Sequence, residues 1–315
     1  MKKRAIWLIL SLLLMLIGIF AVISSNPGIF SPTFELLVTV GIYPDSLEPV
    51  ENAAALYQER MQNRIQEVDQ YQEAAIMLRD AMIERKSSIT VEFRLEEGDD
   101  LVAITNAIYE AAFTYDPSLP AAGDYLRQHV RSILYDETLY EDNWAKITYT
   151  VTAYLSTAEQ EQYINRIVPE ILSSLFPEGE DYTTKEQIDL IYRFIRDNLE
   201  YRTSTELTAG SAYSGLSVQE TTCNGYAALL YRLLLEAGIE CRIITGYYQG
   251  AYHAWNLILT PEGWRNVDAT LDDQLPELLK GIEFREYYLF HSTTFFGHER
   301  DYRFLTENFL MDYPE

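Results

Sequence analysis

The sequence predicts an α+β protein: a buried helix packed on an antiparallel sheet, preceded by a long helix and a small α+β domain, with an N-terminal transmembrane helix. Three observations support this class. An apolar run, residues 226–236, follows Cys223 and ends before Gly238, as a fully buried helix does. Segments 89–95, 147–154 and 253–259 have the alternation or β-branching of strands. Residues 5–23 are apolar and carry no charge.

The composition describes a globular, acidic chain. Of the 315 residues, 48% are hydrophobic and 23% charged, and 24 Lys and Arg face 48 Asp and Glu, a formal net charge of -24. Such a field repels nucleic acid, and no basic stripe interrupts it. We therefore expect no nucleic-acid partner.

The N-terminus is the basic and apolar exception. Lys2, Lys3 and Arg4 precede Ala5 to Ile23, a stretch long enough to cross a bilayer as a helix. The basic cluster should stay cytoplasmic. This predicts a single-pass protein of the cell membrane with extracytoplasmic C-terminal domains; the alternative is secretion after signal cleavage.

In chain order, residues 26–32 resemble a linker and 34–42 a possible strand. The apolar spacing predicts a long helix over 51–86, a strand over 89–95, helices over 101–113 and 124–135, and a strand over 147–154. Thr157 to Gln160 has the spacing of a capping box for the next helix. None of these segments contains a motif with catalytic chemistry.

A cluster of Pro, Gly and acidic residues at 176–181 marks the best domain boundary. The predicted division is an anchor or signal at 1–30, a helical plus α+β domain of unassigned role at 31–178, and a catalytic domain at 179–315. Within the last, Thr184 is expected to cap a helix, and residues 202–221 to form a loop that leads to Cys223.

Cys223 is the candidate nucleophile, because it opens the buried helix. The unpaired N–H groups of a helix N-terminus stabilise a thiolate and can donate to a developing oxyanion. Two alternatives remain. Cys223 could be a structural buried thiol, or it could form a disulfide with Cys241, since paired cysteines are common in exported proteins.

His253 and Asp268 are the candidate base and orienting acid. If residues 259 and 264 flank a turn, the two strands place His253 diagonal to Asp268 on one face, within reach of an imidazole and a carboxylate. Alternatively, His253 is a structural histidine and Asp268 only begins a turn.

Other titratable residues have simpler interpretations. Asp272 and Asp273 are interpreted as a solvated pair, His129 as a residue of a helix without a nearby cysteine, and His291 and His298 as packing or surface residues. Because no cluster in the sequence has metal-ligand spacing, we expect no metal and no cofactor.

Residues 184 to about 298 resemble the transglutaminase-like superfamily, in particular its bacterial extracellular members with a papain-like core. The matching segments, in order, are Ser211 to Leu216, Cys223 to Ala227, Ala237 to Ile239, Thr245 to Tyr247, His253 to Asn256 and Trp264 to Thr270. The resemblance implies a catalytic triad of Cys223, His253 and Asp268. It also implies acyl transfer through a thioester, to an amine or to water.

The sequence departs from the family pattern beside the triad. Thr221 and Thr222 stand where members usually have Gly-Val, and Leu271 stands where they usually have Trp. The functional hypothesis is a membrane-anchored cysteine acyltransferase or peptidase of the bacterial cell surface, acting on peptide or protein amides. Its alternative is a catalytically weak or inactive binding or scaffolding module with the same fold. The Cys223 N–H is the first candidate oxyanion donor, with Tyr213 or Gln219 as the second.

Overall fold

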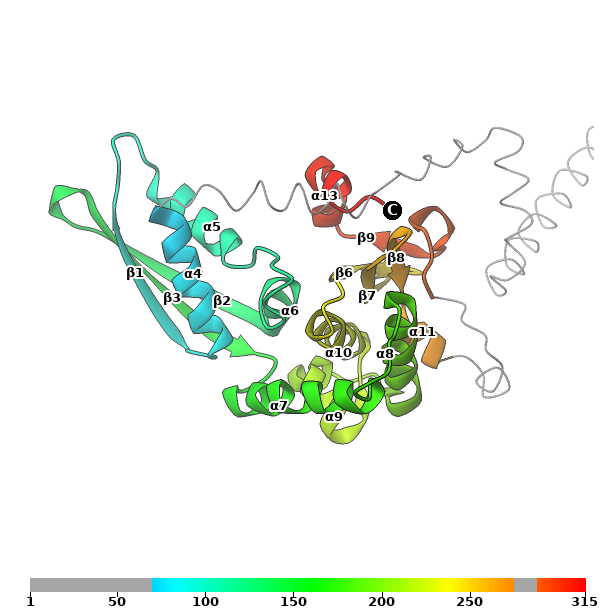
Figure 1. Ribbon diagram of the computed structural model, residues 1–315. Helices are drawn as coiled ribbons and strands as arrows, with labels where there is room; N and C mark the ends of the chain where they lie inside the picture. Colours follow the sequence, from blue (N-terminus) through cyan, green and yellow to red (C-terminus); the bar gives the residue numbers. More distant parts are fainter. Residues whose placement is uncertain (1–69, 275–287) are drawn as a thin grey trace, which may run out of the picture. The chain divides into compact units, whose positions relative to one another are not determined.

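The computed structural model describes residues 70–274 and 288–315 (Figure 1). Its N-terminal region is a mixed α/β unit with an antiparallel sheet in the order β1-β3-β2. In chain order its elements are α4 (Gln70–Ile83), β1 (Ser88–Arg94), α5 (Leu101–Ala111), α6 (Gly123–His129), β2 (Val130–Leu139), η2 (Glu141–Asn143) and β3 (Trp144–Tyr154).

One face of this sheet is buried by helices. Alternate residues of β1, Ile89, Val91 and Phe93, are buried, which confirms the alternation read from the sequence. α4 and α5 contact each other, and α4 contacts β1; both helices contribute side chains to the same apolar cluster as the sheet (Figure 1). The apolar period of the sequence therefore identified the core of this region correctly.

The helix predicted over 124–135 is half wrong. α6 ends at His129, and Val130 begins β2, which pairs with β3. The pairing register shifts between Val130 and Ile133, so β2 contains an irregularity that breaks the period-two alternation of a strand. The remaining spacing of apolar residues resembles that of a helix, and only the partner strand resolves the ambiguity.

Two capped helices follow, α7 (Ala158–Leu175) and α8 (Thr184–Asn198). The predicted capping box at Thr157 and Gln160 is confirmed. The second cap is displaced by one residue, because Thr183, and not Thr184, accepts the Glu186 N–H while Glu186 accepts the Thr183 N–H. Thr184 is instead the first helical residue.

The segment 202–221 is not a plain loop. It contains η3 (Leu207–Gly210), α9 (Ala212–Val218) and β5 (Glu220–Thr221), and β5 pairs in parallel with β4 (Glu200–Tyr201). Ser211 caps α9 by accepting the Ser214 N–H. The Ser and Thr residues of this segment favoured a loop prediction, although Ser211 serves here as a helix cap.

The remaining core is a helix on a sheet, as predicted. α10 (Cys223–Glu236) is buried along nearly its whole length and contacts β6 (Cys241–Tyr248) and β7 (Ala251–Thr260). The sheet has the order β8-β7-β6-β9, with β8 (Gly263–Val267) next to β7 and β9 (His298–Arg300) antiparallel to β6. The other elements of this region are α11 (Ala269–Asp273), η4 (Ser292–Thr294), η5 (Tyr302–Phe304) and α13 (Glu307–Asp312).

Several predictions fall outside the described residues. These are the apolar segment 5–23, the possible strand 34–42 and the first part of the long helix, of which the described part, α4, ends at Ile83. Among the residues that the structure describes, no helix has the length and hydropathy needed to cross a bilayer. The division at 30/31 and 178/179 stays a prediction.

Candidate active site

Cys223 is the first residue of α10 and is half-buried. Thr222 precedes it as the N-cap residue but gives no side-chain cap, so the first N–H groups are not capped by that hydroxyl. The neighbouring Thr221 side chain donates instead to the Ala209 carbonyl, at 2.7 Å. Gly225 is required by this packing, because a Cβ there would overlap the Thr221 hydroxyl.

Both cysteines are free, so the disulfide alternative is wrong. Cys241 is fully buried on β6, where the Asn256 amide lies 3.4 Å from its sulfur. Burial raises the pKa of the Cys241 thiol well above its ordinary value. Cys241 is therefore a structural core residue, as its apolar surroundings in the sequence indicated.

His253 is buried on β7, with 7% of its surface exposed. The β7-β8 hairpin pairs Leu259 with Trp264, which confirms the predicted register. This register brings the His253 Nε2 atom to 2.6 Å from Asp268 Oδ2, directly after β8.

Asp268 is fully buried and its carboxylate accepts hydrogen bonds at both oxygens. Oδ1 accepts the Thr270 and Leu271 N–H groups, at 3.0 and 3.1 Å, so Asp268 also caps α11. Oδ2 accepts hydrogen bonds from the Nε2 atoms of His253 and His298. The two sequence interpretations of Asp268, orienting acid and start of a turn, are thus compatible in one residue.

The charges of this cluster support one another. Burial alone would lower the pKa of His253, but hydrogen bonds with Asp268 and Cys223, and the charges of both, raise it to about 10. Burial would likewise raise the pKa of Asp268, whereas hydrogen bonds from His253 and His298 lower it to about 2. We therefore regard the pair as an ionised carboxylate that stabilises an imidazolium. Cys223 is close enough to His253 to raise the pKa of its imidazole, so the three predicted residues lie near one another.

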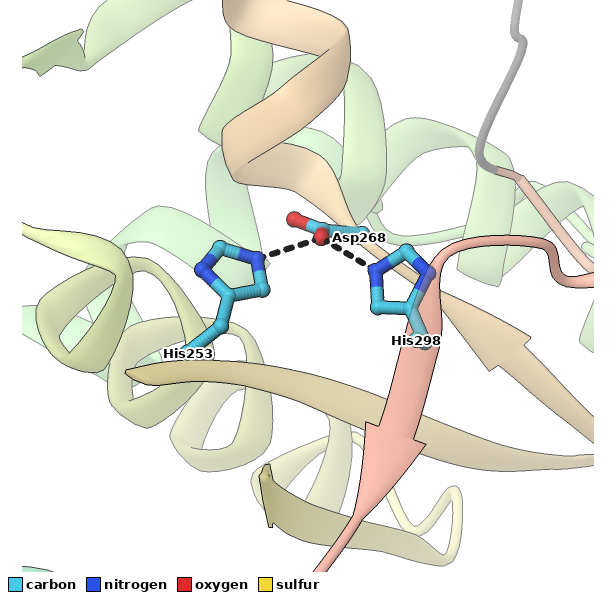
Figure 2. Close-up of side chains that lie close together, drawn as sticks. All are labelled: His253, Asp268 and His298. Atoms are coloured by element: carbon cyan, nitrogen blue, oxygen red, sulfur yellow. Dashed lines mark hydrogen bonds and ion pairs between the residues drawn. The ribbon is translucent and has the colours of Figure 1, made fainter. Parts of the chain in front are cut away.

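His298 was missed as a site residue. It lies on β9, opposite Tyr248 of β6, and its Nε2 atom is 3.0 Å from Asp268 Oδ2. Figure 2 shows the two imidazoles on either side of one carboxylate, His253 from β7 and His298 from β9. The expected packing role is real, since His298 stacks on Phe295, but it is incomplete. A strand of three residues gives too weak a sequence signal to reveal this contact.

The comparisons with known proteins point to the same segment. Residues 175–269 match the family model of the transglutaminase-like superfamily. Over those residues the chain is transglutaminase-like.

The curated relatives of this chain are distant in sequence. The kyphoscoliosis peptidase of Homo sapiens is 28% identical over 146 residues, which covers 40% of this chain and 22% of the peptidase. The chain thus spans about a fifth of the length of the curated relative it matches.

Two solved structures are similar in part. A candidate cysteine protease from Cytophaga hutchinsonii has 17% identity and a TM-score of 0.29, covering 44% of this chain and 62% of that chain. The periplasmic domain of TgpA from Pseudomonas aeruginosa, bound to ethylmercury, has 18% identity and a TM-score of 0.27, covering 44% of this chain and 64% of that chain.

Asp272 and Asp273 are buried, so their interpretation as a solvated pair is wrong. Asp272 accepts a hydrogen bond from the Tyr192 hydroxyl. Asp273 accepts from the Tyr226 hydroxyl at 2.8 Å and from the Tyr201 N–H at 3.1 Å. These contacts fasten α11, and with it Asp268, to α8, α10 and β4.

The second oxyanion donor stays a prediction. Tyr213 packs edge-on against Tyr163, with ring centroids 5.4 Å apart. Gln219 ends α9 in a left-handed conformation, with φ 59°.

His253, Asp268 and His298 also place three possible ligand atoms within 4.8 Å of one another, among the described parts of the chain. Because both imidazoles are hydrogen-bonded to the Asp268 carboxylate, we interpret the cluster as a hydrogen-bonding network.

Proposed function

We propose that the chain is a cysteine enzyme that acts on peptide or protein amide bonds through a thioester formed on Cys223. The observation that carries this proposal is the His253–Asp268 hydrogen bond beside Cys223, whose thiol raises the pKa of His253 and lies at the N-terminus of a buried helix. A nucleophile within hydrogen-bonding reach of a base, which a third group orients, is the arrangement that activates a weak nucleophile.

Proton transfer follows from the orientation of His253. Its Nε2–H group donates to Asp268 Oδ2, at 2.6 Å, which leaves Nδ1 to accept the Cys223 proton. The resulting thiolate attacks the amide carbonyl, and the imidazolium then returns its proton to the departing amine. Water or an amine resolves the thioester, which gives hydrolysis or acyl transfer.

The location of the enzyme is a separate part of the proposal. The basic Lys2 to Arg4 and the uncharged segment 5–23 support a membrane anchor with the catalytic domain outside the cell. Fractionation of cells that express the full-length chain tests it. Recovery of the intact chain in the soluble fraction, with Met1 retained, would contradict the anchor without affecting the chemistry.

The catalytic proposal is tested by alkylation with iodoacetamide at neutral pH, read by mass spectrometry of the Cys223 peptide. We expect Cys223 in the full-length chain to react faster than an ordinary thiol, and His253→Ala to remove that advantage. Buried Cys241 is the internal reference and should stay unmodified until the chain unfolds. Equal rates in the wild type and His253→Ala would leave a binding module as the better interpretation.

The acceptor is identified in a second experiment. Incorporation of a fluorescent primary amine into a glutamine-bearing protein indicates acyl transfer, whereas new amino termini indicate peptide hydrolysis. Cys223→Ser is the control for both products, because a hydroxyl is a much poorer nucleophile than a thiolate. A product that persists in Cys223→Ser does not originate at this site.

A further inference from the structure

Each ring nitrogen of His298 lies against a hydrogen-bond acceptor. Nε2 is 3.0 Å from Asp268 Oδ2, and Nδ1 is 3.2 Å from the Phe296 carbonyl oxygen. Neither an ionised carboxylate nor a carbonyl can donate, so both contacts are satisfied only when both ring nitrogens carry a proton. This geometry favours the imidazolium form of His298.

The surroundings of His298 also suit a cation. Its ring stacks on Phe295, with centroids 3.8 Å apart, and lies 4.8 Å from the ring of Tyr248 and 4.9 Å from that of Trp255. Aromatic faces attract cations. The side chain is only 2% exposed, so its charge needs a buried counter-charge, and Asp268 is in contact with it.

We propose that His298, as an imidazolium, is a positioning residue that fixes the Asp268 carboxylate and limits how strongly this carboxylate holds a proton on His253. The inference rests on the proposed function, in which His253 must release its proton to the departing amine. Because His253 and His298 share one oxygen, the second cation takes up part of the carboxylate's charge.

Two backbone features allow this arrangement. β9 pairs with β6 so that Gly246 lies opposite both His253 and Arg300. A Cβ on Gly246 would overlap the Glu299 carbonyl oxygen, so glycine permits the close approach of β9. His298 is thereby held on the face of the sheet that carries His253 (Figure 2).

The other charged and titratable groups near the pair do not replace the His298 charge. Asp268 is the acid next to both imidazoles, and the Cys223 thiol raises the pKa of His253. Burial raises the pKa of Tyr192 and Tyr201, so their phenols stay neutral. Other titratable groups near the pair, within the described parts of the chain, include the phenol of Tyr248 beside the ring, exposed Glu299, and Arg300, which pairs with Glu315.

The test is the pH dependence of Cys223 alkylation in the full-length chain, compared between wild type and His298→Gln. Glutamine can donate to Asp268 but carries no charge. The rings of His253 and His298 are 5.9 Å apart, so loss of this cation should stabilise the His253 imidazolium and destabilise the thiolate. We expect the midpoint of the alkylation curve to move to higher pH by at least about 0.5 pH units.

His291→Gln is the matched control, because His291 lies in the same C-terminal segment and should leave the midpoint unchanged. An unchanged midpoint in folded His298→Gln overturns the positioning role. That result leaves the proposed function intact, provided that His253→Ala still abolishes the fast alkylation. If both His298→Gln and His253→Ala keep the fast alkylation of Cys223, the proposed function is overturned instead.

If circular dichroism shows that His298→Gln does not fold, ¹⁵N NMR of the wild-type histidine rings decides the question. The four histidines are assigned with His129, His253 and His291 variants, and His298 by elimination. Both ring nitrogens of His298 should show the chemical shift of a protonated nitrogen at pH 7. A neutral tautomer at that pH contradicts the proposal.

Discussion

At the residue scale, Asp268 serves two functions through its two oxygens. Oδ1 caps α11, whereas Oδ2 is bonded to the imidazoles. Substitution by alanine would remove both sets of contacts at once. Asparagine is the informative replacement, because it is also a good N-cap residue but carries no charge.

We predict that Asp268→Asn folds but loses the fast alkylation of Cys223 at pH 7, by at least about 10-fold relative to wild type, because an ordinary thiol with a pKa of about 8.5 is only slightly ionised at that pH. Without the carboxylate charge, the pKa of His253 falls from its raised value of about 10, and the thiolate loses its cation. Glu262→Gln, in the exposed turn of the same hairpin, is the control. A wild-type rate in Asp268→Asn would mean that Asp268 only caps a helix.

Gly225 fixes the position of the nucleophile, because it lies two residues after Cys223 in α10 and packs against Thr221. We predict that Gly225→Ala destabilises the chain by about 2 kcal/mol or displaces Cys223, because the added Cβ overlaps the Thr221 hydroxyl. Urea unfolding and the alkylation rate measure the two effects. The double variant with Thr221→Gly removes the hydroxyl and should recover part of the loss. Additive effects of the two substitutions would contradict the clash.

At the element scale, the close approach of β9 to β6 requires a residue without a side chain, Gly246, on β6. We predict that Gly246→Ala displaces β9 and separates His298 from Asp268, because its Cβ would meet the Glu299 carbonyl. Hydrogen exchange of the β9 amide groups and the pH midpoint of Cys223 alkylation should change together. Tyr247→Ala, the neighbouring position with an exposed side chain, is the control. Retained β9 protection in Gly246→Ala would contradict this prediction.

The elements that were predictable have local signals. The capping box at Thr157, the alternation of β1 and the β7-β8 hairpin each depend on residues close in sequence. β2 was not predictable, because an irregularity disrupts its alternation and β3 supplies its hydrogen bonds. α9 was not predictable either, because Ser and Gly are poor helix formers and Ser211 acts through its cap.

The residues of the candidate site also differ in whether a local sequence signal places them. The positions of Cys223, His253 and Asp268 could be predicted because a buried helix and one hairpin place them, whereas their catalytic role stays a prediction. His298 could not, since it follows Asp268 by thirty positions and reaches it only through the pairing of β9 with β6. The partners of Asp272 and Asp273, on α8, β4 and α10, are equally remote in sequence.

At the scale of the whole molecule, buried charges cross the predicted domain boundary. The Arg242 guanidinium of β6 donates two hydrogen bonds to the Asp124 carboxylate of α6, at 2.6 and 2.9 Å. Glu161 of α7 pairs with Arg85 at 2.9 Å and with Arg232 of α10 at 3.6 Å. His129 lies in this second cluster: its Nε2 atom is 3.8 Å from Glu161, and its Nδ1–H group donates to the Tyr125 carbonyl oxygen at 2.8 Å.

His129 predicts an acid-sensitive fold. Burial, opposed by Glu161, lowers its pKa from 6.5 to about 4, so the folded chain binds this proton less readily than the unfolded chain does. The contribution of neutral His129 to stability is therefore present above pH 6.5 and is lost as the pH falls toward 4, by up to about 3 kcal/mol. Urea unfolding at pH 7 and pH 4.5 measures it.

His129→Asn should flatten this acid dependence, because an amide can still donate to the Tyr125 carbonyl but does not titrate in this range. His291→Asn is the control and should retain the wild-type dependence. An equally steep loss of stability in His129→Asn would assign the acid sensitivity to other groups.

The buried phenols that hold α11 give the protein a built-in optical signal. Tyr192 and Tyr226 are bonded to Asp272 and Asp273, and burial raises the pKa of both hydroxyls well above that of a solvated tyrosine. Their conversion to phenolate, which absorbs ultraviolet light at longer wavelengths, therefore requires this part of the domain to open. An alkaline spectrophotometric titration of the unlabelled chain would follow the release of the helix that Asp268 begins, in real time and without any added dye.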